Sequence, residues 1–135
     1  MEQPTLVIVE DDLLLALALT ALVEDLGYRV LATADTQQGA VQVVRERRPD
    51  LVLMDIKLMN GDGLSAAIEI RQSSKVPIIF CTSYDKKGVQ SAVRALGNTA
   101  LIGKPFDETE LADLLVNAVK KSGMSEYAKL SLVAC

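Results

Sequence analysis

Three acidic side chains stand where apolar runs of the sequence end. Glu10 and Asp11 follow one such run, and Asp55 follows another. Carboxylates that are held close together repel one another, so a group of three needs a compensating cation. Mg²⁺ would suit this group, because it takes a few carboxylates and leaves its other positions to waters and phosphate oxygens. We therefore interpret Asp11 and Asp55 as direct Mg²⁺ ligands, with Glu10 acting through water.

A hydroxyl and a lysine follow two further apolar runs, at Thr82 and Lys104. A carboxylate such as Asp55 can act as a nucleophile and form an acyl phosphate. Lys104 would then place a positive charge beside the phosphoryl oxygens, and the Thr82 hydroxyl could donate a hydrogen bond to them. Each residue also has a plainer explanation, as a solvated loop residue, a surface lysine or a helix cap. Asp12 in particular is expected to be a helix N-cap.

The elements that must position these residues alternate regularly along the chain. Five short runs rich in Val, Ile and Leu predict strands that are buried on both faces, at residues 6–9, 29–33, 51–54, 77–81 and 100–103. The longer segments between and after them have helical spacing of apolar residues. This spacing groups Ile68 with Leu64 and Ala67 on the third segment, and Ala92 with Val89 and Val93 on the fourth. Strand and helix alternating five times predict an α/β, flavodoxin-like (βα)5 fold of three layers. Its parallel five-stranded sheet would have the order 2-1-3-4-5.

This fold would bring the polar residues together. In an open parallel sheet, functional groups gather at the carboxyl ends of the strands, near the point where the strand order reverses. The acidic pair, Asp55, Thr82 and Lys104 each follow a different strand, and those four strands are neighbours in the predicted order. Because all five residues are expected at the same place, a common functional site is favoured over a separate structural role for each of them.

Composition excludes several classes of function. The 135 residues suit one domain, which we place at 4–122, followed by a C-terminal tail at 123–135. The chain has 14 basic and 18 acidic residues and no His, so it lacks both a basic stripe for nucleic acid and the commonest general base. It shows no signal peptide pattern and no apolar stretch of the roughly 20 residues that a membrane span needs. We expect a cytoplasmic protein in which Cys81 is a small buried hydrophobic residue.

Four motifs occur in order along the chain: VIVEDD at 7–12, LVLMDIKLMNGDGL at 51–64, CTSY at 81–84 and GKPF at 103–106. Together they resemble the receiver domain of bacterial two-component response regulators, whose fold is also called CheY-like, over residues 4–121. The resemblance implies that Asp55 is the phosphoacceptor, that Glu10 and Asp11 hold Mg²⁺, and that Thr82 and Lys104 contact the phosphoryl group.

The same resemblance implies further details of the site and its partner. The main-chain carbonyl of Lys57 is the expected additional metal ligand, and the Lys104–Pro105 peptide bond is expected to be cis. The phosphoryl donor would be a phosphohistidine on a sensor histidine kinase or on a histidine phosphotransfer protein. A downstream protein, whose identity the sequence does not indicate, would receive the signal.

The sequence departs from the usual receiver pattern at the residues that pass the signal on. Leu101 stands where many receivers carry Tyr or Phe, and Met59 stands where a proline is usual. Phe80 and Tyr84 flank the threonine in FCTSY, which resembles the FATGUY subset of mostly stand-alone receivers that work with HWE or related kinases. Phe80 could equally be a plain core aromatic. Tyr84 could shield the acyl phosphate or belong to the output surface.

Signal transmission is therefore expected to depend on Thr82 and on the segment from Ser83 through the fourth helix, with Leu101 and Pro105 nearby. The predicted function is a phosphorylation switch that acts through protein–protein contact or serves as a phosphate relay or sink. It would not be an enzyme beyond self-catalysed phosphotransfer and autodephosphorylation. One alternative is an aspartyl-phosphate hydrolase of the haloacid dehalogenase kind, although Lys57 occupies the position of its second Asp. The other is an interaction module that is never phosphorylated.

Overall fold

Five strands of aliphatic and β-branched residues form one parallel sheet in the computed structural model, which describes residues 3–83 and 86–121. Our predictions for Tyr84 and for the tail at 123–135 fall outside the described residues. The strands are β1 (Thr5–Val9), β2 (Arg29–Ala34), β3 (Leu51–Asp55), β4 (Ile78–Thr82) and β5 (Thr99–Gly103). Their order in the sheet is β2-β1-β3-β4-β5, which confirms the predicted flavodoxin-like topology.

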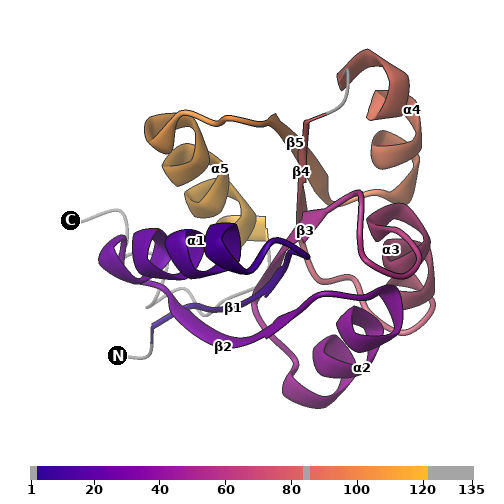
Figure 1. Ribbon diagram of the computed structural model, residues 1–135, viewed down its shortest axis with the longest axis horizontal. Coiled ribbons are helices and arrows are strands. Elements are labelled where there is room, and N and C mark those ends of the chain that lie inside the picture. Colours follow the sequence, from indigo (N-terminus) through magenta and orange to yellow (C-terminus); the bar gives the residue numbers. More distant parts are fainter. Residues whose placement is uncertain (1–2, 84–85, 122–135) are drawn as a thin grey trace.

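Five helices cover the two faces of this sheet (Figure 1). They are α1 (Leu13–Asp25), α2 (Gln37–Arg47), α3 (Gly63–Arg71), α4 (Lys86–Leu96) and α5 (Glu108–Lys121). Helices α1 and α5 pack on one face, and α2, α3 and α4 pack on the other. No helix in the described ranges combines the length and the apolar character that crossing a membrane would require.

Local signals explain where several helices begin and end. The Asp12 carboxylate accepts hydrogen bonds from the backbone N–H groups of Leu14 and Leu15, at 3.0 and 3.2 Å, and caps α1 as predicted. Asp62 caps α3 in the same way. Gly27 follows the end of α1 with a φ of +101°, a left-handed conformation that glycine adopts without steric cost.

The sheet divides the hydrophobic core into two clusters. Side chains alternate between the faces of each strand, so consecutive residues of β3 belong to different clusters. Val52, Met54 and Phe80 pack with α2, α3 and α4. Leu53 and Ile79 pack with α1 and α5. We refer to these as the α2–α4 cluster and the α1/α5 cluster.

Some helix faces differ from the prediction. We expected Ile68 on the buried stripe of α3, but its side chain is 55% exposed, and Ala66 and Ile70 are buried instead. Ala92 of α4 also faces solvent. The physical reason is that both helices carry apolar residues on more than one face, so that spacing alone admits more than one stripe.

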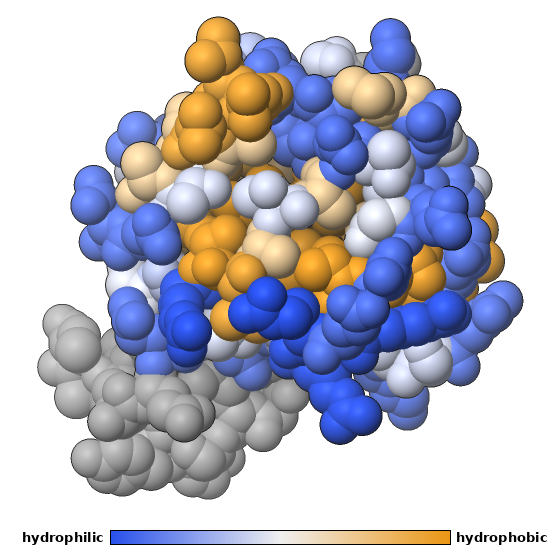
Figure 2. All heavy atoms as spheres, turned by 60° about the horizontal axis from the view of Figure 1, so that its bottom comes forward, coloured by the Kyte–Doolittle hydropathy of each residue, from blue (hydrophilic) through white to orange (hydrophobic). Residues whose placement is uncertain are grey.

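The edge of the sheet is less covered than its centre. β2 is an edge strand, and none of its residues is fully buried. Figure 2 brings forward the bottom of Figure 1, where β2 and α2 lie, and shows a band of hydrophobic residues crossing this face between hydrophilic ones.

Candidate functional site

The three predicted acidic residues lie together at the carboxyl end of the sheet. Glu10 directly follows β1, and its backbone N–H donates to the carbonyl of Ala34 at the end of β2, at 2.9 Å. Asp55 is the last residue of β3, the strand on the other side of β1. Glu10, Asp11 and Asp55 each offer one carboxylate oxygen such that all three oxygens lie within 4.8 Å of one another. The sheet topology therefore creates a cluster of three carboxylates.

Lys104 lies among these carboxylates. Its Nζ atom is 2.6 Å from Oε1 of Glu10 and 3.1 Å from Oδ2 of Asp55, so one ammonium group pairs with both. Its backbone N–H donates to the carbonyl of Thr82, at 2.7 Å, and the Lys104–Pro105 bond is cis, as the resemblance implied. The backbone thus joins the end of β5 to the end of β4 directly beside the carboxylates.

Asp55 is held from two sides. Its Oδ2 atom meets Lys104, and its Oδ1 atom accepts a hydrogen bond from the backbone N–H of Lys57, at 3.3 Å. The residue is 8% exposed, so it is largely shielded from water, yet part of its surface stays accessible. An accessible carboxylate fixed beside an ammonium group is suited to attack an incoming electrophile.

The electrostatics of the cluster follow from burial and crowding. Burial raises the pKa of Glu10, and the neighbouring Asp55 carboxylate raises it further. Burial and the nearness of Glu10 also raise the pKa of Asp11. Burial alone would lower the pKa of Lys104, but its hydrogen bonds to Glu10 and Asp55 outweigh that effect and leave the pKa raised. Lys104 therefore stays charged, and its charge does not fully offset the repulsion among the three carboxylates.

Thr82 and the predicted signal-passing residues lie around β4 and β5. Thr82 ends β4, is 1% exposed, and is paired in the sheet with Gly103. Phe80 is fully buried in the α2–α4 cluster, between Met54 and Leu101 on the neighbouring strands, so it is a core aromatic. Ser83 and Pro105 are exposed, and Leu101 is partly buried.

Cys81 lies on the opposite face of β4 from Thr82 and is buried. Burial raises its pKa to about 12, so the thiol is protonated at neutral pH and is no nucleophile. This confirms the interpretation of Cys81 as a small buried hydrophobic residue.

The residues of the cluster fit a bound Mg²⁺. All three side chains offer hard carboxylate oxygens, and these oxygens lie within 4.8 Å of one another, so one ion could be held by Asp11 and Asp55 directly and by Glu10 through water. The single charge of Lys104 can balance only one of the three carboxylate charges, so a divalent cation would relieve repulsion here. Lys57, whose carbonyl we expected as another ligand, follows β3 by two residues and forms an antiparallel bridge with Asp62.

Sequence reasoning missed two residues near the site. Gly63 begins α3 where a Cβ atom would press against the main-chain oxygen of Asp55, and its N–H donates to Ile56. Gln37 contacts the loop that follows Asp55. The glycine-rich NGDG stretch indicated a close approach of some kind, whereas a glutamine at the start of a helix carries no such signal.

Comparison with known proteins gives a consistent result. The family model described as the response regulator receiver domain matches residues 6–116. The transcriptional regulatory protein PdtaR of Mycobacterium tuberculosis is 32% identical over 114 residues, and the phyllosphere-induced regulator PhyR of Methylorubrum extorquens is 35% identical over 116. Each match covers 84% of this chain but only 56% of PdtaR and 43% of PhyR. The chain thus spans about half the length of these curated relatives.

Solved structures agree. The signal receiver domain of a modulated diguanylate cyclase from Desulfovibrio desulfuricans has a TM-score of 0.81 and 31% identity, covering 93% of this chain and all of that one. The receiver domain of sensor histidine kinase PA1611 from Pseudomonas aeruginosa has a TM-score of 0.79 and 30% identity, covering 88% and 99%. The latter structure holds a magnesium ion coordinated in its active-site cleft.

Proposed function

This chain belongs to the response regulator receiver domains, and from that membership we propose that it is a switch controlled by phosphorylation of Asp55. The salt bridges of Lys104 support the proposal most directly. They fix an ammonium group 3.1 Å from an oxygen of Asp55, at the edge of the sheet where two further carboxylates gather. That arrangement combines a nucleophile, a cation for phosphoryl oxygens and a set of metal ligands in one place.

Phosphorylation would proceed by attack of one Asp55 oxygen on the phosphorus of a phosphohistidine. The new O–P bond forms as the N–P bond breaks, and the bonding pair stays on the imidazole nitrogen, which takes up a proton. The product is an acyl phosphate on Asp55 and a free histidine on the donor. Lys104, already beside Asp55, would balance the charge of the phosphoryl oxygens.

Glu10, Asp11 and Asp55, together with the main-chain carbonyl of Lys57, would hold Mg²⁺. When bound, the ion would neutralise charge on the phosphoryl oxygens and orient the group for transfer. The magnesium ion in the PA1611 receiver domain supports this assignment. The residues of this chain would contribute the ligand oxygens and, through Lys104, a second positive charge.

Readout of the phosphoryl group would begin at Thr82. Its hydroxyl lies at the end of β4, and its carbonyl accepts a hydrogen bond from Lys104, so the two phosphate-contacting residues are linked through the backbone. Phosphorylation would change the relative populations of the conformations that the segment from Ser83 through α4 adopts. Within residues 87–96 of that helix only Val93 is buried, so little packing opposes such a change. Tyr84, Leu101 and Pro105 would modulate it.

The partner that delivers the phosphoryl group would dock beside Asp55. Leu13, Leu14 and Leu17 at the start of α1 are 71%, 78% and 58% exposed, and the first of them follows the acidic pair by two residues in the chain. Exposed large apolar side chains that gather beside a reactive site indicate a protein contact. We propose that this surface, the α1 leucine patch, receives a sensor histidine kinase, of the HWE type, or a histidine phosphotransfer protein.

We further propose that the chain is a cytoplasmic receiver unit, with the domain at 4–122 and the tail at 123–135, and that it resembles the stand-alone FATGUY subset. Its output would be a phosphorylation-dependent contact with a downstream protein, or it would act as a phosphate relay or sink. Comparing proteins captured by beryllofluoride-treated wild type and by the Asp55→Asn variant would separate these outputs.

Labelling by a small phosphodonor tests the central proposal. Incubation with acetyl phosphate and Mg²⁺ should add one phosphoryl group to the wild type and none to Asp55→Asn, as measured by intact-mass spectrometry. Asp12→Asn is the matched control, because Asn also caps helices and should leave both the fold and the labelling intact. Equal labelling of Asp55→Asn and wild type would contradict the assignment.

A further inference from the structure

We propose that Gln37 is a positioning residue for the phosphoacceptor site. Through the loop at residues 57–62 it holds the backbone next to Asp55, and it thereby sets the Mg²⁺ affinity of the site. The inference rests on the proposed function of Asp55. Gln37 is the first residue of α2, on a different strand–helix unit from Asp55, and nothing in its own sequence neighbourhood indicates a role in the site.

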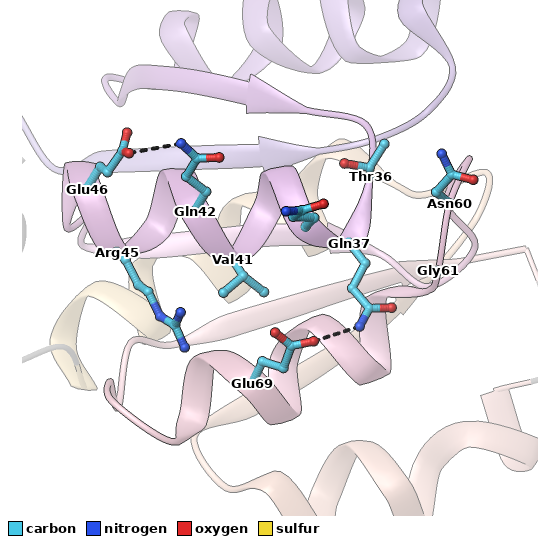
Figure 3. A pocket seen from close by; sticks show the side chains of 10 residues that line it. Thr36, Gln37, Val41, Gln42, Arg45, Glu46, Asn60, Gly61 and Glu69 are labelled. Carbon is cyan, nitrogen blue, oxygen red and sulfur yellow. Dashed lines mark hydrogen bonds between the residues drawn. The ribbon is translucent and has the colours of Figure 1, made fainter.

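The side-chain amide of Gln37 joins two elements. Its Oε1 atom accepts a hydrogen bond from the backbone N–H of Asp62, at 3.2 Å, at the end of the loop. Its Nε2 atom donates to Oε1 of Glu69 on α3, at 2.8 Å. Figure 3 shows Gln37 reaching from α2 toward Glu69, with Gly61 beside it. Both ends of the amide are therefore used.

The backbone strengthens the same connection. The N–H of Gln37 donates to the carbonyl of Asn60, at 2.9 Å, and the N–H of Met59 donates to the carbonyl of Asp35, at 3.3 Å. Together with the side-chain bond to Asp62, three hydrogen bonds thus tie Asp35 and Gln37, at the start of α2, to the loop. The loop continues from the end of β3, and these hydrogen bonds hold it against α2.

Gly61 shows how closely the two segments approach. Its φ is +82°, and a Cβ atom at this position would overlap the side chain of Gln37. Gly61 therefore meets two requirements at once, a left-handed backbone and room for the glutamine. A side chain here would force Gln37 away from Asp62 and open the connection.

The other end of the loop reaches the site itself. Asp62 is bridged to Lys57, and the N–H of Lys57 donates to Oδ1 of Asp55. Lys57 also carries the carbonyl that we expect to bind Mg²⁺. The bridge between Lys57 and Asp62 is closed by their chain neighbours, because the N–H of Gly63 donates to the carbonyl of Ile56 at 2.6 Å. The hydrogen bond of Gln37 with Asp62 and that of Lys57 with Asp55 are therefore connected through this backbone bridge. Residues that orient metal ligands from outside the first coordination sphere commonly control metal affinity.

Gln37→Ala tests the proposal, and Gln42→Ala is its matched control. Gln37, Gln42 and Glu69 line a common groove between α2 and α3 (Figure 3). The amide of Gln42 also bonds to a carboxylate, that of Glu46 at 3.0 Å, but this bond stays within α2. Gln37→Ala should raise the Mg²⁺ concentration needed for half-maximal acetyl phosphate labelling by about tenfold. Gln42→Ala should leave it unchanged.

A second readout needs neither phosphorylation nor Mg²⁺. Amide hydrogen exchange, followed by NMR in the metal-free protein, should become up to about tenfold faster at Lys57 and Asp62 in Gln37→Ala, the change that losing a neutral hydrogen bond produces. The amides of β1 should be unaffected. Faster exchange throughout the protein would show general destabilisation and would overturn the positioning role.

Exchanging the two partners should restore the wild-type behaviour. Gln37→Glu alone sets two carboxylates against each other across the groove. Adding Glu69→Gln reverses donor and acceptor and preserves both the net charge and the acceptor for Asp62. The double variant should recover the Mg²⁺ dependence of the wild type. If Gln37→Ala fails to fold, the comparison of Gln37→Glu with the double variant tests the positioning role of Gln37 instead. If the wild type labels normally and Gln37→Ala and Gln37→Glu show the same Mg²⁺ dependence of labelling, this inference is overturned while the proposed function stands. Wild type that does not label would overturn the proposed function and the inference with it.

Discussion

At the scale of single residues, the site contains more negative charge than the unphosphorylated chain can neutralise. Lys104 pairs with Glu10 and Asp55, while Asp11 forms no salt bridge with any residue that the structure describes. Burial raises the pKa values of Glu10 and Asp11, and the neighbouring carboxylates raise them further. Retaining these carboxylates costs stability, which is common where function requires like charges to gather.

Replacing Asp11 should therefore stabilise the metal-free protein. Burial and the nearby Glu10 disfavour the ionised form of Asp11 in the folded chain but not in the unfolded chain, and they thereby raise its pKa on folding. Asp11→Asn should raise the free energy of unfolding by at most about 1 kcal/mol, since the side chain is partly exposed and water screens it. As the pH falls through the raised pKa of folded Asp11, the wild type takes up a proton and the difference should shrink. Thermal unfolding at several pH values measures it.

Mg²⁺ provides the control for this prediction. An ion that binds only the folded state stabilises it by mass action, so added Mg²⁺ should favour the wild type over Asp11→Asn and reverse the order of their midpoints. An asparagine variant that is already less stable than wild type at pH 7 without the ion would contradict the prediction.

At the scale of elements, the start of α3 limits how the end of β3 can be arranged. Gly63→Ala would bring a Cβ atom against the main-chain oxygen of Asp55 and to 2.9 Å from the Met54 side chain. We expect a destabilisation of about 1–3 kcal/mol, as for other overpacked sites, together with slower labelling of Asp55. Urea denaturation and the rate of acetyl phosphate labelling measure the two effects.

Gly88→Ala in α4 is the matched substitution. No described atom beyond the local helix backbone lies within 4 Å of the added methyl group, so the change should stabilise the helix by about 0.5–1 kcal/mol. If both variants lost stability equally, the contact at Asp55 would not be the cause.

The elements themselves were largely predictable. Runs rich in aliphatic residues located all five strands to within about one residue at each end. The central strands β1, β3 and β4 are buried on both faces and need such runs. The edge strands β2 and β5 are mostly only partly buried, contrary to the prediction, because each has a neighbouring strand on one side only. The site followed from the topology, because Asp55 and Lys104 each follow a strand. Helix faces were less certain, and Ile68 was placed wrongly. Contacts such as that of Gln37 with Asp62 join segments 25 residues apart and leave no local pattern to find.

At the scale of the whole molecule, the α1 leucine patch and the phosphoacceptor are separable. Leu14 is 78% exposed, so Leu14→Lys removes little packing and should leave the fold and acetyl phosphate labelling unchanged. If a donor protein docks on this patch, the substitution should slow transfer from it by about tenfold or more, as for the loss of an interface residue worth over 1 kcal/mol.

The measurement uses the phosphorylated histidine kinase that labels wild type fastest in a transfer profile. Gln42→Lys serves as a control for added charge, because Gln42 is exposed on α2, which packs on the other face of the sheet. Unchanged transfer to Leu14→Lys would place the docking surface elsewhere.

The sheet that separates the α2–α4 cluster from the α1/α5 cluster has a consequence for how such a protein can diverge. The proposed donor contact lies on the α1 side, whereas Val93, which anchors the proposed responsive helix α4, belongs to the other cluster. Each surface is therefore supported by its own core cluster, and substitutions that adapt one surface to a new partner leave the packing beneath the other surface unchanged. A lineage could exchange its kinase while keeping its downstream target, or the reverse, and an engineer could graft either half onto another receiver without redesigning both.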